Sequence, residues 1–267
     1  MIKFGDSGYD VIELQLFLKA NGFKVEADGE FGKITLAAVK AFQHRVGIAQ
    51  DGIIGPVFMS YMTSFRDSAA LGIKSKVLKM AEKIPDRFKV KLVAVRDFKV
   101  SDGNNQFGTF DDAFFVISPN SFRYFKANTD PSRVGWNQNA GKQMAQLDLG
   151  LHYFIKGMHK QKYRGFRQPN KEVEDEVSIL VNSGLTKSNC DFTVNRVAAV
   201  GSDKNYKETG YYAINIHPGG VSGSTSSEGC QTLPYAQFDE FRDHTYNRLD
   251  AFGQKVLPFL LVNGPVY

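Results

Sequence analysis

The stretch INIHPGG at residues 214–220, followed by SSEGC at residues 226–230, sets the expectation for the second half of the chain. His217 ends an apolar run of the kind that forms β-strands. Thirteen positions later, Cys230 follows Gly229 at the end of a loop of small residues. Glycine and serine let the backbone reverse direction, so the pattern predicts that the imidazole and the thiol converge.

This pair of residue types indicates acyl-transfer chemistry. A thiol attacks a carbonyl as the thiolate, and a nearby imidazole is the usual way to form that ion pair. We therefore predict that Cys230 is a nucleophile and that His217 is its base. A turn at Gly229 suits backbone N–H groups that face a developing oxyanion. The alternative is that both side chains are buried structural residues, and the spacing alone leaves the two interpretations open.

The order apolar-His217-x-Gly219, then Ser227-x-Gly229-Cys230, resembles the active-site segment of the L,D-transpeptidase (YkuD-like) catalytic domain. It resembles the divergent versions of that domain in phage endolysins more closely still. The resemblance implies that His217 is the base, that Cys230 is the nucleophile and that the turn at Gly229 helps to form the oxyanion hole. Ser227 matches the hydroxyl residue that opens the segment, and we expect it to contact the substrate.

The chain also departs from the family pattern. Glu228 stands where the family usually has a second histidine, and Gln231 and Thr232 replace the Arg or Asn that follows the cysteine. Glu228 is our candidate for the third group, which orients the imidazole. Transfer of the acyl group to an amine and transfer to water both stay open. The resemblance is specific over residues 211–235 and diffuse over residues 85–262.

The N-terminus contains an internal near-repeat. Residues 28–32 read DGEFG and residues 51–55 read DGIIG, and each Asp-Gly turn is a signal for a following helix. Apolar residues recur at helical spacing over residues 11–20 and again over residues 34–46. The pattern predicts three short helices joined by Asp-Gly turns.

The sequence of this segment resembles the peptidoglycan-binding domain 1 family over nearly its whole length. The resemblance implies that bacterial peptidoglycan is the partner of this chain. The loop from Asp28 to Thr35 is the expected contact, with Asp28, Phe31 and Thr35 as ligand residues. The structural interpretation of the same segment places its apolar residues in the hydrophobic core.

Together the two halves predict the α+β class, with a small three-helix bundle and a mainly β catalytic domain of L,D-transpeptidase-like type. We expect the helical domain at residues 1–65, a linker at residues 66–85 and the catalytic domain at residues 86–267. Val-, Phe-, Tyr- and Ile-rich strand segments occur at residues 90–95, 114–117, 122–125, 192–200 and 211–216, and helical spacing occurs at residues 75–84, 171–181 and 235–252.

Other polar residues carry two interpretations. Asp112, beside Asp111, either lines the substrate cleft or forms a hydrogen-bonded turn. Arg196 either binds a carboxylate of the stem peptide through two parallel donors or forms a structural ion pair. His152 and His159 raise the possibility of a metal-dependent peptidase, but no tight zinc motif accompanies them. We predict no metal and no cofactor.

Charge and cysteine content narrow the range of expected partners and cellular locations. The net charge of +5 over 267 residues favours anionic surroundings such as wall polymers. The Lys and Arg residues are scattered, so we predict no nucleic-acid partner. We predict no secretory signal and no integral membrane segment. We expect a monomer that accumulates in the host cytoplasm until the membrane is breached and then acts in the cell wall or periplasm. Cys190 is predicted to be structural and unpaired, because a disulfide with Cys230 would silence the nucleophile.

The sequence therefore predicts a peptidoglycan-degrading endolysin that cleaves the stem peptide or the cross-link. The alternatives are an L,D-transpeptidase that remodels peptidoglycan, a muramidase-type glycosidase, and a non-catalytic wall-binding or virion protein. A glycosidase needs two carboxylates across a cleft. The acidic run at residues 172–176 is more typical of a solvated face.

Overall fold

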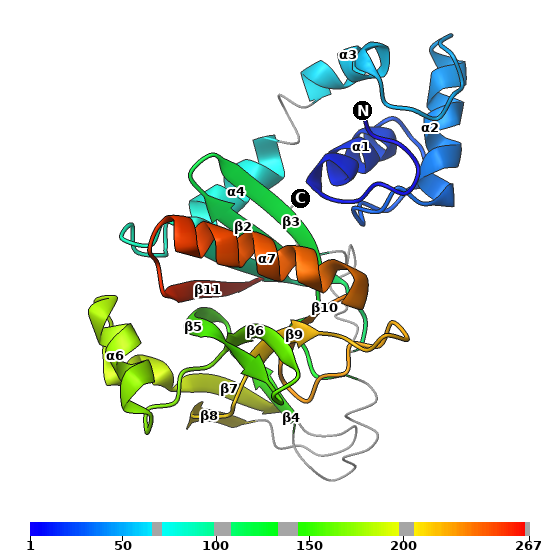
Figure 1. Ribbon diagram of the computed structural model, residues 1–267. Coiled ribbons are helices and arrows are strands. Elements are labelled where there is room, and N and C mark those ends of the chain that lie inside the picture. The colour runs from blue at the N-terminus through cyan, green and yellow to red at the C-terminus, as the bar shows by residue number, and fades with distance from the viewer. Residues whose placement is uncertain (66–70, 99–107, 133–143, 198–205, 265–267) are drawn as a thin grey trace. The chain divides into compact units, whose positions relative to one another are not determined.

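The computed structural model describes residues 1–65, 71–98, 108–132, 144–197 and 206–264 (Figure 1). The chain forms two compact units, one over Met1–Lys79 and one that begins at Met80. The first unit is helical, and the second is mainly β with added helices, as the α+β class predicts. Helix α4, Leu71–Ala81, lies in the segment expected to be a linker, whose residues 66–70 are outside the described residues.

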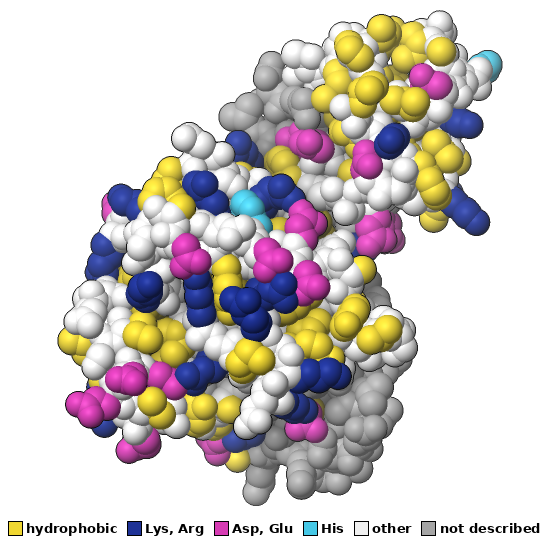
Figure 2. Space-filling view, in the orientation of Figure 1, with side chains coloured by type: hydrophobic (Ala, Val, Ile, Leu, Met, Phe, Trp, Pro, Cys, Tyr) yellow, Lys and Arg dark blue, Asp and Glu magenta, His cyan; other side chains and the backbone are white. Residues whose placement is uncertain are grey.

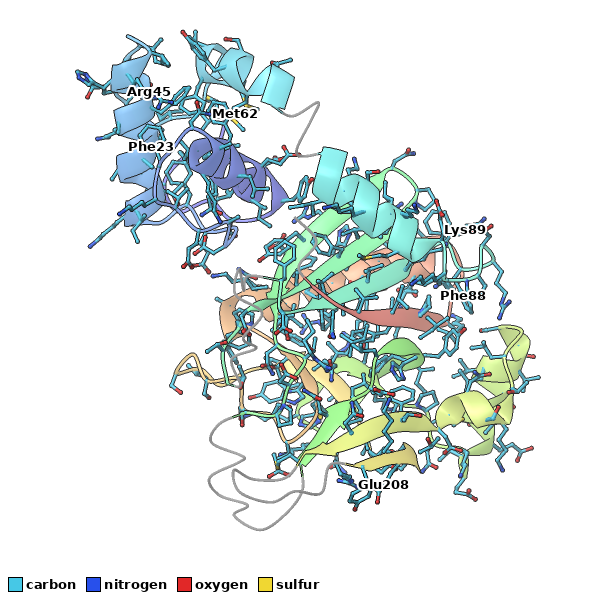
Figure 3. All side chains as sticks on the ribbon, turned by 180° about the vertical axis from the view of Figure 1, so that it is seen from behind. Phe23, Arg45, Met62, Phe88, Lys89 and Glu208 are labelled. Carbon is cyan, nitrogen blue, oxygen red and sulfur yellow. The ribbon has the colours of Figure 1, made fainter. Side chains whose placement is uncertain are left out.

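The N-terminal unit contains the three predicted helices, α1 (Tyr9–Ala20), α2 (Lys33–Arg45) and α3 (Pro56–Phe65). Their apolar faces meet in one core, as helical spacing requires. The Arg45 guanidinium covers the core at 4.8 Å from the centroid of the Phe23 ring, and Figure 3 labels both residues. The core residues are Ile2, Val11, Leu14, Phe17, Leu18, Val25, Phe31, Ala38, Val39, Phe42, Ile54, Phe58 and Met62.

The near-repeat is a repeated hydrogen-bond pattern. Gln15 of α1 donates from Nε2 to Asp28 Oδ1 at 2.6 Å and accepts the N–H of Gly29 at 2.8 Å. Gln43 of α2 makes the same pair of bonds, to Asp51 at 2.7 Å and from the next glycine at 2.9 Å. Each Asp-Gly turn is therefore fixed by a glutamine of the preceding helix.

The second unit has an eight-stranded sheet in the order β10-β9-β6-β5-β11-β1-β2-β3 and a three-stranded sheet in the order β4-β7-β8. The strands of the larger sheet are β1 (Lys91–Arg96), β2 (Asp112–Ser118), β3 (Ser121–Ala127), β5 (Gly150–His159), β6 (Tyr163–Arg167), β9 (Asn215–Pro218), β10 (Gln231–Leu233) and β11 (Val256–Asn263). The smaller sheet contains β4 (Met144–Leu147), β7 (Phe192–Val197) and β8 (Tyr206–Gly210).

The large sheet closes on itself. Asn128 follows β3 at one edge and forms an antiparallel bridge with Thr232 in β10 at the other edge. The two backbone hydrogen bonds of this bridge measure 2.7 and 2.9 Å. The result is a barrel-like unit whose closure lies two residues from Cys230.

The described part of this unit also contains helices α6 and α7. Helix α7, Tyr235–Ala251, packs against the sheet, and the fully buried Phe241 ring lies 5.4 Å from Phe125 and 5.8 Å from Phe114 between ring centroids (Figure 1). Helix α6 spans Glu174–Asn182, close to the predicted residues 171–181. A short 3-10 helix, Lys187–Cys190, precedes β7.

The strand predictions need correction at several points, and β4, β8, β10 and β11 are absent from them. Only residues 215 and 216 of the predicted segment 211–216 are in a strand, because β8 ends at Gly210 and β9 begins at Asn215. The hairpin of β5 and β6 was not predicted at all. Its sequence mixes Gly, Lys, Arg and His with apolar residues, and this hides the alternation typical of strands.

Surface charge is mixed on the face of the β-rich unit in Figure 2, where Lys and Arg side chains are interspersed with Asp and Glu. Lys156 pairs with Asp250 at 2.5 Å, and Arg123 pairs with Glu240. On this face the pattern differs from the single-sign basic stripe of nucleic-acid-binding proteins. Among the described residues, no helix combines the length and the apolar character that crossing a lipid bilayer requires.

Candidate active site

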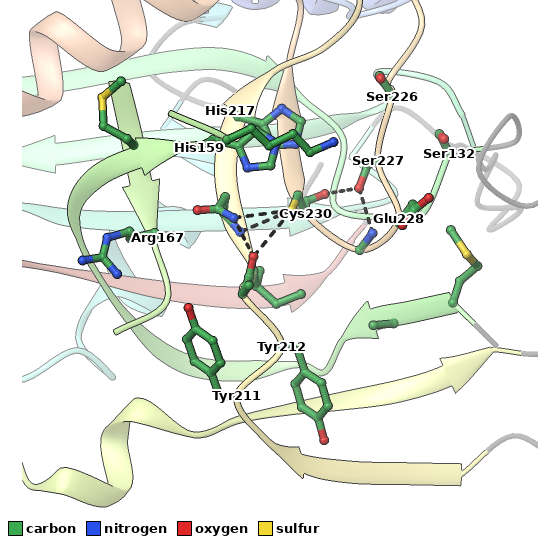
Figure 4. Close-up of a pocket in the computed structure, with 18 of the residues that line it drawn as sticks. Ser132, His159, Arg167, Tyr211, Tyr212, His217, Ser226, Ser227, Glu228 and Cys230 are labelled. Carbon is green, nitrogen blue, oxygen red and sulfur yellow. Dashed lines mark hydrogen bonds between the residues drawn. The ribbon is translucent and has the colours of Figure 1, made fainter. Parts of the chain in front are cut away.

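Parallel pairing of β9 with β10 brings the predicted nucleophile and base together. Thr232 pairs with His217 in this register, and Cys230 comes directly before β10. The thiol sulfur, one ring nitrogen of His217 and one ring nitrogen of His159 all lie within 4.8 Å of one another. These side chains line one pocket of about 890 Å³, shown in Figure 4.

The tautomer of His217 follows from its backbone contact. Nδ1 lies 2.7 Å from the carbonyl oxygen of Pro218. A carbonyl oxygen only accepts, so Nδ1 carries the proton and Nε2 has the free lone pair. The group that orients the imidazole is therefore this carbonyl and not Glu228, which corrects the sequence prediction. Glu228 lines the same pocket.

A second histidine completes the cluster. The His159 ring stacks on the His217 ring, with centroids 4.1 Å apart and an interplanar angle of 4°. His159 ends β5, and Lys160 and Gln161 form the tight turn into β6, both with left-handed φ angles of 49° and 55°. Turns of this type usually contain Asn or Gly. Two bulkier residues in left-handed backbone are a strained arrangement of the sort that collects at functional sites.

Burial keeps both members of the Cys–His pair neutral. It lowers the pKa of His217 to about 4, assisted by the neighbouring His159 and by Lys160. Burial also raises the pKa of the Cys230 thiol, although the Asn215 N–H at 3.4 Å from the sulfur opposes this shift. At neutral pH the resting pair is thus thiol and imidazole. This differs from the thiolate and imidazolium expected from the residue types.

The turn before the nucleophile depends on two residues, Gly229 and Ser227. Gly229 has φ 147°, and a Cβ there would collide with the carbonyl oxygen of Ala145, so only glycine fits. The Ser227 hydroxyl accepts the Gly229 N–H at 3.0 Å and donates to the Cys230 carbonyl at 2.6 Å. The Gly229 N–H therefore does not face an oxyanion. Ser227 is 3% exposed, shapes the turn and lines the pocket, so its contact with substrate stays a prediction.

The two other predicted substrate residues differ in position. Arg196 lines the pocket, and its Nε donates to Glu208 at 2.8 Å, so the structural ion pair is present at the pocket wall. Asp112 is fully buried and is not among the lining residues. Its carboxylate accepts the N–H groups of Asp97 at 2.8 Å and Thr129 at 2.5 Å. Asp112 therefore begins strand β2 and ties two distant loop segments to it, so it forms no local turn and does not line the cleft.

The residues predicted to contact peptidoglycan in the N-terminal unit are mostly internal. Phe31 is 2% exposed in the helical core, and Thr35 is 3% exposed with its hydroxyl 3.1 Å from Gln15 Nε2. Neither side chain is placed to contact a polymer, which corrects the prediction. Asp28 is half-buried, and its carboxylate holds the first Asp-Gly turn.

Two groups among the described residues could hold a metal ion. One is His159, His217 and Cys230, and the other is Asp97, Asp111 and Asp112. His152 belongs to neither, because its Nε2 is 2.8 Å from the Asp148 carbonyl and its ring packs on Phe192. Cys190 is buried and unpaired, as expected of a structural residue.

Sequence reasoning assigned His159 no part in the Cys–His chemistry, since its partners are far away in the chain. The signal that could have found it is the short segment HKQK at residues 159–162, where a three-residue turn joins two unpredicted strands. Recognition of that hairpin would have placed His159 beside the sheet edge that carries β9.

Comparisons with known proteins give partial matches. The chain is 43% identical over 79 residues to the N-acetylmuramoyl-L-alanine amidase CwlL of Bacillus licheniformis, covering 28% of this chain and 20% of that protein. It spans about a fifth of the length of the curated relatives it matches.

Two solved structures are also similar. An L,D-transpeptidase of Stackebrandtia nassauensis is 14% identical, with a TM-score of 0.32 and coverage of 99% of this chain and 96% of that chain. The endolysin of Burkholderia AP3 phage is 33% identical, with a TM-score of 0.23 and coverage of 31% and 32%. In the N-terminal unit, residues 7–62 match the family described as a putative peptidoglycan binding domain.

Proposed function

We propose that this chain is a peptidoglycan hydrolase of the endolysin type, which cleaves the stem peptide or the cross-link by Cys–His acyl transfer. The observation that carries the proposal is the meeting of the Cys230 thiol and the His217 imidazole in one pocket. The match of residues 7–62 to a putative peptidoglycan binding domain supports the choice of polymer. The resemblance of the Cys230 segment to L,D-transpeptidases supports the choice of reaction.

The reaction starts from the neutral pair. Nε2 of His217 takes the thiol proton as the Cys230 sulfur attacks a carbonyl carbon of the stem peptide. The Pro218 carbonyl, which accepts the Nδ1–H at 2.7 Å, stabilises the imidazolium that forms. His217 then protonates the leaving amine, and water resolves the thioester. We assign the oxyanion to the backbone N–H of Cys230, and one such donor is typically worth about 2.7–4 kcal/mol.

The pocket lining fits a peptide substrate better than a glycan-cleaving site. Lys160 contributes a cationic group that suits a carboxylate of a stem peptide, whereas Arg167 and Arg196 are paired with Glu176 and Glu208. Among the described residues that line the pocket, the only carboxylate is Glu228. A muramidase needs a pair of carboxylates. Transfer to an amine, as in a transpeptidase, uses the same thioester and differs only in the acceptor.

Replacement of the nucleophile tests the proposal. Cys230→Ala should abolish the release of wall fragments from purified sacculi and retain sedimentation with them. Cys190→Ala removes the other thiol, which is outside the pocket, and serves as the matched control. Mass spectrometry of the wild-type digest should show new amino termini. Wall lysis by Cys230→Ala would remove the thiol from the mechanism, and new reducing ends would indicate a glycosidase.

A further inference from the structure

We propose that Cys230, His217 and His159 form a zinc-binding site, and that a bound Zn²⁺ reversibly withholds the thiol from substrate. Only the inhibitory consequence rests on the proposed function. The metal site itself rests on three donor groups that separate parts of the chain bring to one pocket.

The donor set is one that zinc prefers. Zn²⁺ binds Cys sulfur at about 2.3 Å and His nitrogen at about 2.0–2.1 Å, which places tetrahedral ligand atoms about 3.4–3.6 Å apart. The three ligand atoms here lie within 4.8 Å of one another. Formation of the site therefore needs the ligand atoms to close by roughly 1 Å, together with a rotation of one histidine ring. Binding replaces the thiol proton by a sulfur–zinc bond and releases one proton to solvent.

His217 already has the arrangement of a metal ligand. Metal-bound histidines usually donate the other ring N–H to a carboxylate or a backbone carbonyl, which fixes the ring orientation. The Nδ1–H of His217 donates to the Pro218 carbonyl at 2.7 Å. Its Nε2 lone pair is left for the ion, so this ligand is oriented before binding.

His159 is the movable ligand. Two parallel stacked rings cannot both direct lone pairs at one ion, so one ring has to turn. His159 is half-buried, and its ring nitrogens make no hydrogen bond with any part of the chain that the structure describes. Rotation about its Cβ–Cγ bond therefore breaks only the stacking contact with His217. The strained turn at Lys160 and Gln161 holds this side chain over the pocket.

The nearby charges set the strength of binding. Lys160 acts electrostatically on both histidines and on Cys230, and it opposes a divalent cation. Glu228 acts on Cys230 in the opposite sense. Three protein ligands leave a fourth position on the ion open toward the pocket, so water or a chelator can reach it. These features favour reversible occupancy over a closed structural site.

Metal binding can be measured without any turnover. The full chain, freed of metal, is titrated with Zn²⁺ against a chromophoric chelator and with Co²⁺ followed by absorption. We expect one equivalent of Zn²⁺ and a thiolate-to-cobalt band in the near ultraviolet. His159→Asn should weaken Zn²⁺ binding more than about tenfold. Mutation of a residue that only orients a metal ligand already costs about tenfold, and loss of a ligand should cost more. Cys230→Ser should remove the cobalt band. His44→Asn, a change at an exposed histidine of the helical unit, should match wild type.

The outcomes separate the zinc site from the proposed function. Equal affinity in wild type and His159→Asn, or a cobalt spectrum without a thiolate band, would overturn the site. Protection of Cys230 from iodoacetamide by Zn²⁺, reversed by a chelator, supports it. If Cys230→Ala still lyses walls, the hydrolase mechanism fails while these binding results stand. If Zn²⁺ binds with the expected ligands and leaves wall lysis unchanged, the inhibitory role is wrong.

Discussion

At the scale of single residues, Cys230 rests as the neutral thiol. Burial raises its pKa above the ordinary 9.0, so the fraction of thiolate at neutral pH is small. In a metal-free buffer, alkylation by iodoacetamide should therefore speed up with pH through a midpoint above 9.0, because a raised pKa moves thiolate formation to higher pH. The buried Cys190 should react only on unfolding. A rate that is already level at pH 7 would indicate a resting ion pair and contradict this.

The turn at Gly229 gives a second prediction at this scale. Gly229→Ala should strain the backbone by roughly 1–3 kcal/mol and also push against the Ala145 carbonyl, which cannot give way like a flexible side chain. Gly223→Ala is the matched control in the same loop, since Gly223 has φ 84° with open space around its Cβ position. Thermal unfolding should show a larger loss for Gly229→Ala. Equal losses would mean that backbone strain alone is at work.

At the scale of elements, prediction from sequence succeeded where periodicity was local. Helices α1 and α2 were predicted because their apolar residues recur within one segment, and β1 and β2 because they are short apolar runs. The site was only half predicted. His217 and Cys230 share one segment, whereas His159 reaches them through a strand pairing between β6 and β9 that no local pattern reveals. Burial, which sets the protonation of the pair, is likewise a property of the folded barrel.

The paired glutamines give a prediction at the element scale. Gln15→Ala leaves the buried Gly29 N–H without its acceptor, which costs about 1–3 kcal/mol. Hydrogen exchange at that amide, measured by NMR, should quicken roughly 10- to 100-fold. Gln43→Ala should do the same at Gly52, because its bonds repeat those of Gln15. Gln50→Ala, at an exposed position, is the control. Unchanged protection at Gly29 would show that the glutamine does not hold the turn.

At the scale of the whole molecule, the proposed function assigns chemistry and attachment to separate compact units. The helical core and the barrel core are distinct clusters, each closed by its own apolar residues. A wall-binding unit raises the local concentration of the active site at an insoluble polymer and adds no contact at the reacting atoms. The division predicts that attachment and chemistry can be lost independently.

Deletion of residues 1–65 should therefore lower the rate on intact sacculi roughly tenfold to hundredfold, as loss of a tether does. The rate on small soluble muropeptides should stay within about twofold, because a freely diffusing substrate gains nothing from the tether. Both substrates are compared at equal enzyme concentration, and circular dichroism confirms that the shortened chain is folded. Cys230→Ala in the full chain provides the reverse case, with attachment kept and chemistry lost. Equal losses on both substrates would show that the helical unit supports the catalytic fold itself, and the assignment of separate roles would fail.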